Sequence, residues 1–302
     1  MANNAVKTVG KMFQNYSSGF GDEQLDRFIA DSERMMRPPA TLLLAQAGLD
    51  ASTSEPFTLL DHACGTGPIA AHLQANVDQR VLSQSKILCA DVHSTMADTL
   101  KKRVEKHKWV NVETAYLDAQ ESGLPAQSFS HVTLNFAMHI IPNPEAVLRD
   151  TMRVLKPGGT LAFSVWHKDN AGWLPDIRSS FETLPFEAPL PDHIPMAING
   201  KPYIVDPELL PAWLENAGFE GVKVQTLKHV VPIQGPEDYL QCFGMVKDSM
   251  IDIYWSEEQK KNASPILDQH IVKHLAGKHE GRGWDLTWTS ILVTCRKPNT
   301  SG

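Results

Sequence analysis

The residues with the clearest chemical potential lie in one short segment, residues 59–67, which reads Leu-Leu-Asp-His-Ala-Cys-Gly-Thr-Gly. An apolar run leads into a turn with two glycines, and a helical pattern follows. Gly65 and Gly67 let the backbone turn sharply and let a ligand come close, because they carry no Cβ. The free N–H groups at the start of the next helix favour a negative group there. The segment therefore predicts a ligand-binding turn between a strand and a helix.

Acidic residues at the ends of three apolar runs narrow the choice of ligand. The glycine spacing fits the looser dinucleotide-binding fingerprint, and Asp91 lies about where a ribose-binding acid is expected. Asp61 would repel a pyrophosphate, whereas it suits the ammonium group of a bound amino acid. Asp118 is placed to accept a hydrogen bond from the exocyclic amine of adenine. An NAD-dependent oxidoreductase stays open as an alternative, but Asp61 and Asp118 argue against it.

The strands and helices that must position these residues follow from the hydrophobic pattern. Apolar runs that predict strands occupy residues 57–60, 86–90, 112–116, 131–136 and 160–166, and helical patterns occupy residues 69–75, 94–106 and 144–154. Strands that alternate with helices over this length indicate βαβ units and a parallel sheet covered by helices on both faces.

Further elements extend this core at both ends. Two more strands are expected at residues 222–233 and 287–296, with mostly helical residues 237–279 between them, and N-terminal helices are expected at residues 5–16 and 23–47. The second N-terminal helix is expected to be interrupted near Pro38 and Pro39, because proline breaks the helical hydrogen-bond pattern. We therefore expect an α/β fold with a Rossmann-like, seven-stranded, mostly parallel sheet, an N-terminal helical cap and a helical insertion between the last two strands.

The organisation predicted along the chain is a single domain over residues 1–302. Residues 1–55 would form the helical cap and residues 56–166 the ligand-binding core. Residues 167–205 are crowded with prolines and would form a lid over the substrate. Residues 206–302 would hold the last two strands with their helical insertion.

Composition limits the classes of partner. The net charge of -7 makes nucleic acid a poor partner, because an acidic chain does not attract a phosphate backbone. No apolar run approaches the length that spans a bilayer, so no membrane partner is expected. The four cysteines are widely spaced, and three of them lie in or beside apolar runs, which favours buried free thiols in a reducing compartment. We expect a cytoplasmic protein with a small-molecule substrate; the sequence is silent on its oligomeric state.

With these motifs in order, followed by Leu-Lys-Pro-Gly-Gly at residues 155–159, the chain resembles the class I S-adenosylmethionine-dependent methyltransferases over residues 57–166. The resemblance implies S-adenosyl-L-methionine as cofactor. It also implies a set of cofactor-binding residues. Beside the methionine part would lie Asp61, Ala63, Gly65, Thr66 and Gly67, and Asp91 would hold the ribose. Near the adenine would lie Val92, Met96, Asp118 and Ala119, and next to the methyl group Asn135 and Phe136. The family more often has glycine where this chain has Ala63.

A narrower resemblance rests on residues 109–114, 123–125 and 255–259, which are similar to fungal secondary-metabolite methyltransferases, including the gliotoxin-type thiol methyltransferases. It implies a small, largely apolar natural product as methyl acceptor and leaves open whether oxygen, sulfur or nitrogen is methylated. A catalytically silent, cofactor-binding regulatory protein of secondary metabolism stays open as the alternative function.

Methyl transfer from a sulfonium is an in-line displacement in which proximity and alignment do most of the work. His139 and His167, each just after a strand, are the candidate general bases, although an ordinary loop or cleft-lining role is favoured for both. The residues expected to line the substrate are all aromatic: Phe13, Tyr16, Phe20, Trp166 and Trp173. Asp169 and Asn170 are similar to the metal-binding pair of catechol-type methyltransferases, but Asn135 stands where those enzymes need an acid, so we expect no metal.

Overall fold

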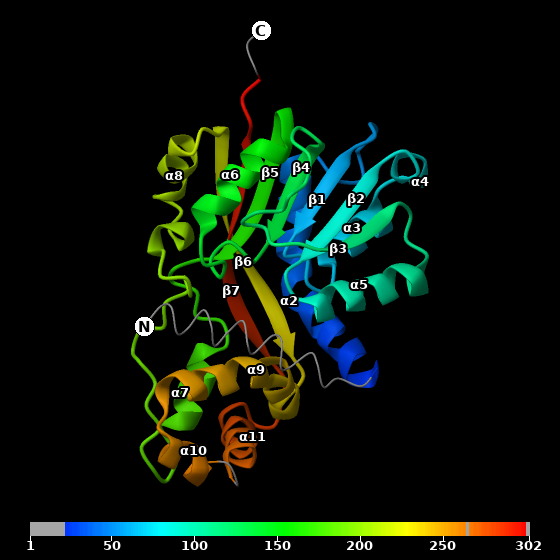
Figure 1. The fold of residues 1–302 in the computed structure, drawn as a ribbon. Coiled ribbons are helices and arrows are strands. Elements are labelled where there is room, and N and C mark those ends of the chain that lie inside the picture. Colours follow the sequence, from blue (N-terminus) through cyan, green and yellow to red (C-terminus); the bar gives the residue numbers. More distant parts are fainter. Residues whose placement is uncertain (1–21, 264–265, 300–302) are drawn as a thin grey trace.

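A single twisted sheet of seven strands organises the part of the chain that the computed structural model describes, residues 22–263 and 266–299 (Figure 1). The strands are β1 (Thr58–His62), β2 (Lys86–Asp91), β3 (Val112–Tyr116), β4 (Phe129–Asn135), β5 (Leu155–Trp166), β6 (Glu220–Ile233) and β7 (Trp284–Arg296). Their order is β3-β2-β1-β4-β5-β7-β6, with β1 to β5 parallel and β7 antiparallel to both of its neighbours. The expected seven-stranded, mostly parallel sheet is confirmed.

Helices cover the sheet on both faces, as expected (Figure 1). One face carries α2 (Asp22–Ala47), α3 (Pro68–Asn76), α4 (Gln79–Leu82) and α5 (Ser94–His107), and the other carries α6 (Pro144–Val154) and α8 (Leu210–Asn216). Along β1, Leu59 packs into the core under α2 and α3, whereas Leu60 packs into the core under α6. Burial on both faces explains why the parallel strands appear in the sequence as continuous apolar runs.

A third core lies beyond the carboxyl ends of the parallel strands, where β6 and β7 extend past the sheet (Figure 1). It is formed by the ends of those two strands with α7 (Leu174–Phe181), α9 (Pro236–Tyr254), α10 (Glu257–Ala263) and α11 (Leu267–Lys278); a 3₁₀ turn, η1 (Pro202–Val205), follows the proline-rich stretch. The helical insertion between the last two strands is therefore present as three helices, and it packs beside the ligand-binding edge of the sheet.

The expected interruption of the N-terminal helix is wrong, because α2 runs unbroken through Pro38 and Pro39. Proline removes one backbone hydrogen bond per residue, but its fixed φ is compatible with a helix. Packing offsets that loss, since Ala40, Leu43 and Leu44 directly after the prolines are completely buried. Tertiary contacts of one face of α2 thus decide its conformation.

Strand β5 begins five residues earlier than its apolar pattern indicates. Leu155 already pairs with Phe129 of β4, and the N–H of Gly158 donates to the carbonyl of Lys297 beyond β7. The Lys-Pro-Gly-Gly run is therefore part of the sheet and carries a register shift against β4.

No helix within the described ranges is both long enough and apolar enough to cross a membrane.

Candidate functional site

The turn after β1 has the backbone of a ligand cradle. Ala63, Gly65 and Gly67 all have left-handed φ angles, of 49°, 53° and 84°. A Cβ on Gly67 would lie 2.3 Å from Cδ1 of the buried Leu100, so only glycine fits there. A Cβ on Gly65 would meet no atom within 4 Å, so the space beside Gly65 is open to a ligand. Ala63 adopts this conformation without being glycine, which accounts for the preference for glycine at this place in the family.

Thr66 lies between the two glycines and is buried. Its carbonyl accepts a hydrogen bond of 2.5 Å from Arg103 of α5, which anchors the turn to the helix after β2. Two residues of α5 therefore hold the turn, Leu100 against Gly67 and Arg103 against Thr66.

Asp61, the acid that precedes the turn, is buried with half of its carboxylate unused. Its Oδ1 accepts a hydrogen bond of 2.7 Å from Thr133 Oγ1, whereas Oδ2 has no hydrogen-bond partner among the described residues. Burial, with a smaller contribution from nearby Asp91, raises the pKa of Asp61 to about 7, although the hydrogen bond from Thr133 opposes this. A buried carboxylate oxygen without a donor needs one. The ammonium group of a methionine moiety supplies such a donor together with a compensating charge, so Asp61 fits the cofactor.

Asp91, at the end of β2, is already engaged by the backbone of the site. Its Oδ2 accepts from the N–H of Gly65 and its Oδ1 from the N–H of His93, both at 2.9 Å. Burial is the largest influence on the pKa of Asp91 and raises it, although these two hydrogen bonds oppose the effect. Each carboxylate oxygen has a second lone pair, so the fixed carboxylate can still accept from two ribose hydroxyls.

The residues expected near adenine lie at the ends of β2 and β3. Val92 is 44% exposed, whereas Met96 and Ala119 are buried. Asp118 is exposed, and its Oδ1 accepts from the N–H of Gln120 at 2.8 Å. A small cavity of about 140 Å³ opens beside Val92 and is also lined by His93, Ser94, Thr95 and Tyr116.

A larger depression of about 590 Å³ lies between α5 and the edge strand β3, away from the turn after β1. Its lining contains none of the predicted site residues, and we assign it no role in cofactor binding.

At the end of β4, Asn135 and Phe136 are fixed against β5. Ser164 Oγ donates to Asn135 Oδ1 at 2.7 Å, and the N–H of Phe136 lies 3.0 Å from both Ser164 Oγ and the Ser164 carbonyl. Phe136 has a left-handed φ of 55°, an unusual conformation for a bulky residue. This turn places the Phe136 ring against Trp166, with ring centroids 4.0 Å apart.

A row of aromatic rings continues from Phe136 into the third core. The centroid of Trp166 lies 4.7 Å from that of Trp288, and Trp288 lies 5.8 Å from Phe243 of α9. Trp166 was expected to line the substrate, but Trp288 and Phe243 were missed, because their own stretches of sequence show only an ordinary strand and helix. Trp173 is buried in the third core, where its carbonyl accepts from the hydroxyl of Tyr239 at 2.6 Å.

The two candidate bases lie in different environments. His139 is buried, its Nδ1 makes no hydrogen bond within the described ranges, and burial lowers its pKa to about 3. It is therefore neutral at physiological pH. His167 is half-buried after β5, and its Nδ1 accepts from the N–H of Asp169 at 3.1 Å.

Asn170, the second member of the metal-pair pattern, has a structural contact. It is buried, and its Oδ1 accepts from the N–H of Thr289 on β7 at 2.8 Å, while Asp169 is exposed. The amide oxygen thus ties the chain after β5 to β7. The remaining aromatic residues expected to line the substrate, Phe13, Tyr16 and Phe20, lie outside the described residues.

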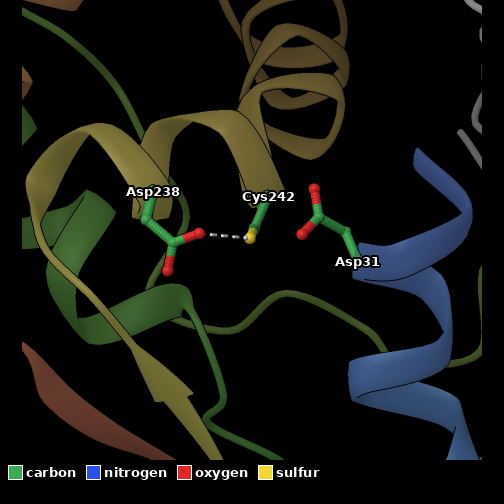
Figure 2. Close-up of side chains that lie close together, drawn as sticks. All are labelled: Asp31, Asp238 and Cys242. Atoms are coloured by element: carbon green, nitrogen blue, oxygen red, sulfur yellow. Dashed lines mark hydrogen bonds between the residues drawn. The ribbon is translucent and has the colours of Figure 1, made fainter. Parts of the chain in front are cut away.

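Within the described ranges, one cluster of three side chains has the spacing of a metal site and lies between α2 and α9 (Figure 2). Asp31 comes from α2, and Asp238 and Cys242 from α9. Arg34 fills this group with its guanidinium, which lies 2.9 Å from Asp238 Oδ2 and 3.0 Å from Asp31 Oδ1 and also contacts Cys242 Sγ. The positive charge that a metal would bring is already supplied by Arg34, so the cluster is a clamp between two helices.

Comparisons with known proteins find methyltransferases. The model of the ubiE/COQ5 methyltransferase family matches residues 47–171, which hold the turn after β1 and the ends of the five parallel strands. Methyltransferase tpcH of Aspergillus fumigatus is 29% identical, with 86% of this chain and 91% of that protein covered. The acetylaranotin bis-thiomethyltransferase of Aspergillus terreus is 26% identical over 88% of this chain and 92% of its own.

Among solved structures, a methyltransferase from Bacillus halodurans superposes with a TM-score of 0.50 at 20% identity, over 86% of this chain and 98% of that one. This likeness concerns the fold. The relatives match nearly the whole chain and the family model matches the ligand-binding core, so these matches indicate an S-adenosylmethionine-dependent methyltransferase that is similar to those of fungal secondary metabolism.

Proposed function

We propose that this protein transfers the methyl group of S-adenosylmethionine to an oxygen, sulfur or nitrogen atom of a small, largely apolar natural product. The observation that carries the proposal is the row of aromatic rings, Phe136, Trp166 and Trp288, which starts beside the predicted methyl position and leads away from it. An apolar wall of this kind suits an apolar acceptor. The bis-thiomethyltransferase among the relatives keeps sulfur on the list of acceptor atoms.

The protein's own contribution to this reaction is binding and alignment. Asp61 would hold the ammonium group, and Asp91 would hold the ribose through the oxygens that Gly65 and His93 already fix. When bound, the cofactor would supply a methyl carbon activated by a sulfonium: a lone pair of the acceptor would form the new bond to that carbon as the carbon–sulfur bond breaks, S-adenosylhomocysteine would leave, and the acceptor proton would pass to solvent. Burial lowers the pKa of His139 to about 3, which makes its imidazole a weak base, and we assign it no proton transfer.

Calorimetric titration with S-adenosylhomocysteine, beside NADH as control, tests the cofactor half of the proposal. We expect binding of S-adenosylhomocysteine alone. Incubation with labelled S-adenosylmethionine and a panel of apolar thiols, phenols and carboxylic acids then tests transfer. Binding without transfer to any acceptor would favour the silent regulatory protein, and preference for NADH would overturn the proposal.

A further inference from the structure

Within the described part of the chain, a cluster of buried polar atoms on β7 has no hydrogen-bond partner. Its members are Trp288 Nε1 and Ser290 Oγ, and the imidazole of His229, which interacts with the main chain of Met35, lies beside them. The three residues are 4%, 0% and 9% exposed. Buried polar groups are almost always hydrogen-bonded, because an unpaired one costs free energy. Two unpaired groups in one place therefore indicate a ligand that supplies the missing partners.

Strand register places the three side chains on one face of the sheet. His229 pairs with Trp288, and Ser290 pairs with Trp166, the last residue of β5. Directly paired residues point to the same face, and every second residue along a strand returns to it. Leu292, two residues after Ser290, packs against Leu43 of α2 on this face. The polar cluster thus lies on the α2 side, level with and beyond the carboxyl end of β5.

The cluster lies where the two helices covering this face approach each other. Met35 of α2 lies beside His229. Burial lowers the pKa of His229, and a contact with the Met35 main chain, which favours the protonated imidazole, partly opposes this. Phe243 of α9 stacks on Trp288 at 5.8 Å. Arg34 joins the two helices through its ion pairs with Asp31 and Asp238. The clamp therefore holds α2 and α9 together over the cluster.

The indole of Trp288 is held rigidly, so its N–H has a fixed direction. A Cβ on Gly172 would lie 3.0 Å from three atoms of the Trp288 ring, so this loop packs closely on the indole. Trp166 packs against it as well, with ring centroids 4.7 Å apart. Because the indole is already fixed in the free protein, ligand binding costs little of its conformational entropy, and the hydrogen bond contributes more to affinity.

The cluster is also within reach of the methyl position. The ring centroids of Phe136 and Trp166 lie 4.0 Å apart, and those of Trp166 and Trp288 lie 4.7 Å apart. Two ring contacts therefore connect the end of β4 to the Trp288 indole. The three rings offer flat apolar surfaces that suit a flat aromatic ligand. Aromatic side chains favour offset or edge contacts with such a flat ligand.

We propose that Trp288, Ser290 and His229 form the polar end of the methyl-acceptor site, and that the acceptor is a planar, fused-ring aromatic compound with a carbonyl or phenolic oxygen that accepts from the Trp288 indole. The inference rests on the proposed methyl transfer and defines its substrate class. The indole N–H can only donate, so its partner is an acceptor oxygen, whereas the hydroxyl of Ser290 and the neutral imidazole of His229 can each donate or accept.

The test uses the full chain saturated with S-adenosylhomocysteine and two probes of equal ring size, 2-acetyl-1-naphthol and naphthalene. Trp288→Phe removes the indole N–H and keeps an aromatic ring. Trp255→Phe is the matched control, because the Trp255 indole already donates to the Pro189 carbonyl at 3.0 Å, away from the cluster. Ser290→Ala is a smaller second change that removes only a hydroxyl.

We expect the unaltered protein to bind 2-acetyl-1-naphthol at least roughly tenfold more tightly than naphthalene, in line with two or more hydrogen bonds. Trp288→Phe and Ser290→Ala should each reduce that margin about threefold to tenfold, whereas Trp255→Phe should preserve it and lower the melting temperature instead. Equal binding of both probes, or a margin unchanged in Trp288→Phe and Ser290→Ala, overturns the inference. If S-adenosylhomocysteine itself fails to bind, the proposed function fails instead.

Discussion

The ligand-binding edge has a cofactor half at the ends of β1 and β2 and an acceptor half at β6 and β7, and the two halves are built differently. At the ends of β1 and β2, the main chain already fixes the acid predicted to hold the ribose, because Asp91 is bound by the amides of Gly65 and His93. Among the described residues, Asp61 Oδ2, Thr66 Oγ1 and the ring nitrogens of His62 have no partner there. At β6 and β7, Trp288 and Ser290 bring together buried polar atoms without partners. The first half suits a ligand that is the same in every reaction. The second depends on its ligand to complete it, as a site adapted to one acceptor would.

The most severe test of the first half is Asp91→Ala. Two charge-assisted hydrogen bonds to the ribose would be lost, together with the support of the Gly65 and His93 amides. We expect calorimetry to show S-adenosylhomocysteine binding weakened by roughly 100-fold or more. Asp98→Ala is the control, because Asp98 is an exposed carboxylate on nearby α5. Equal affinity in Asp91→Ala and Asp98→Ala would mean that the ribose lies elsewhere.

The rigidity of the glycine turn is tested by comparing Gly67→Ala with Gly65→Ala. Both positions have left-handed φ angles, but only the Cβ at Gly67 would meet Leu100, at 2.3 Å. We expect chemical denaturation to show a loss of about 2–4 kcal/mol for Gly67→Ala and about 1–2 kcal/mol for Gly65→Ala.

Gly65→Ala should in turn weaken S-adenosylhomocysteine binding more than its modest loss of stability explains, because its Cβ would enter the open space beside the turn. The expected ranking fails if Gly65→Ala is the less stable variant, or if it binds the product as the unaltered protein does.

Asp61 predicts a pH dependence of cofactor binding. Its pKa in the free protein is about 7, and the ammonium group of the ligand favours its ionised form. Below pH 7 binding must therefore displace a proton, so S-adenosylhomocysteine affinity should fall by up to about tenfold per pH unit between pH 7 and pH 5.5. Asp61→Asn should bind weakly and with a flatter profile. A profile that Asp61→Asn leaves unchanged would assign the dependence to another group.

The raised pKa of Asp61 also affects the stability of the ligand-free protein, which should fall with rising pH although ligand affinity rises. The folded pKa of about 7 lies above the usual value of 3.8, so between these values the folded state binds more protons than the unfolded state. The free energy of unfolding should therefore fall as pH rises through this window, by at most about 1.4 kcal/mol per unit. Asp61→Asn should reduce the slope, and saturating S-adenosylhomocysteine should do the same at pH 7.

The fold could be predicted because its signals are local. Strands buried on both faces are continuous apolar runs, and Asp61 and Asp91 mark where two of them end at the ligand-binding edge. The cofactor residues lie in the same short stretches, so their motif specifies their position. Pro38 and Pro39 show the limit of local reasoning, since packing of α2 against the sheet outweighs the two lost hydrogen bonds.

The acceptor half could not be predicted in the same way. His229 and Trp288 meet only because β6 and β7 pair across the whole helical insertion, and nothing near either residue signals that pairing. Trp288 alone resembles any strand tryptophan. Its significance comes from an unpaired Nε1 and from contact with Trp166, both of which depend on the complete fold.

The smallest expected effect tests whether the clamp between α2 and α9 serves the acceptor half alone. Arg34→Gln removes the guanidinium that lies between Asp31 and Asp238, both about one-fifth exposed. Partly exposed ion pairs of this kind contribute little, so the free energy of unfolding should fall by only about 1–2 kcal/mol. Arg80→Gln, which breaks the exposed pair with Asp78, should leave stability unchanged.

Arg34 joins α2 to α9 beside the polar cluster, whereas the neighbouring Glu33 pairs with Arg103, which binds the glycine turn. Loss of Arg34 should therefore raise KM for the methyl acceptor several-fold and change KM for S-adenosylmethionine much less. A rise in both KM values would mean that the two halves of the edge are coupled through α2. A change in the cofactor KM alone would reverse the assignment of this clamp to the acceptor half.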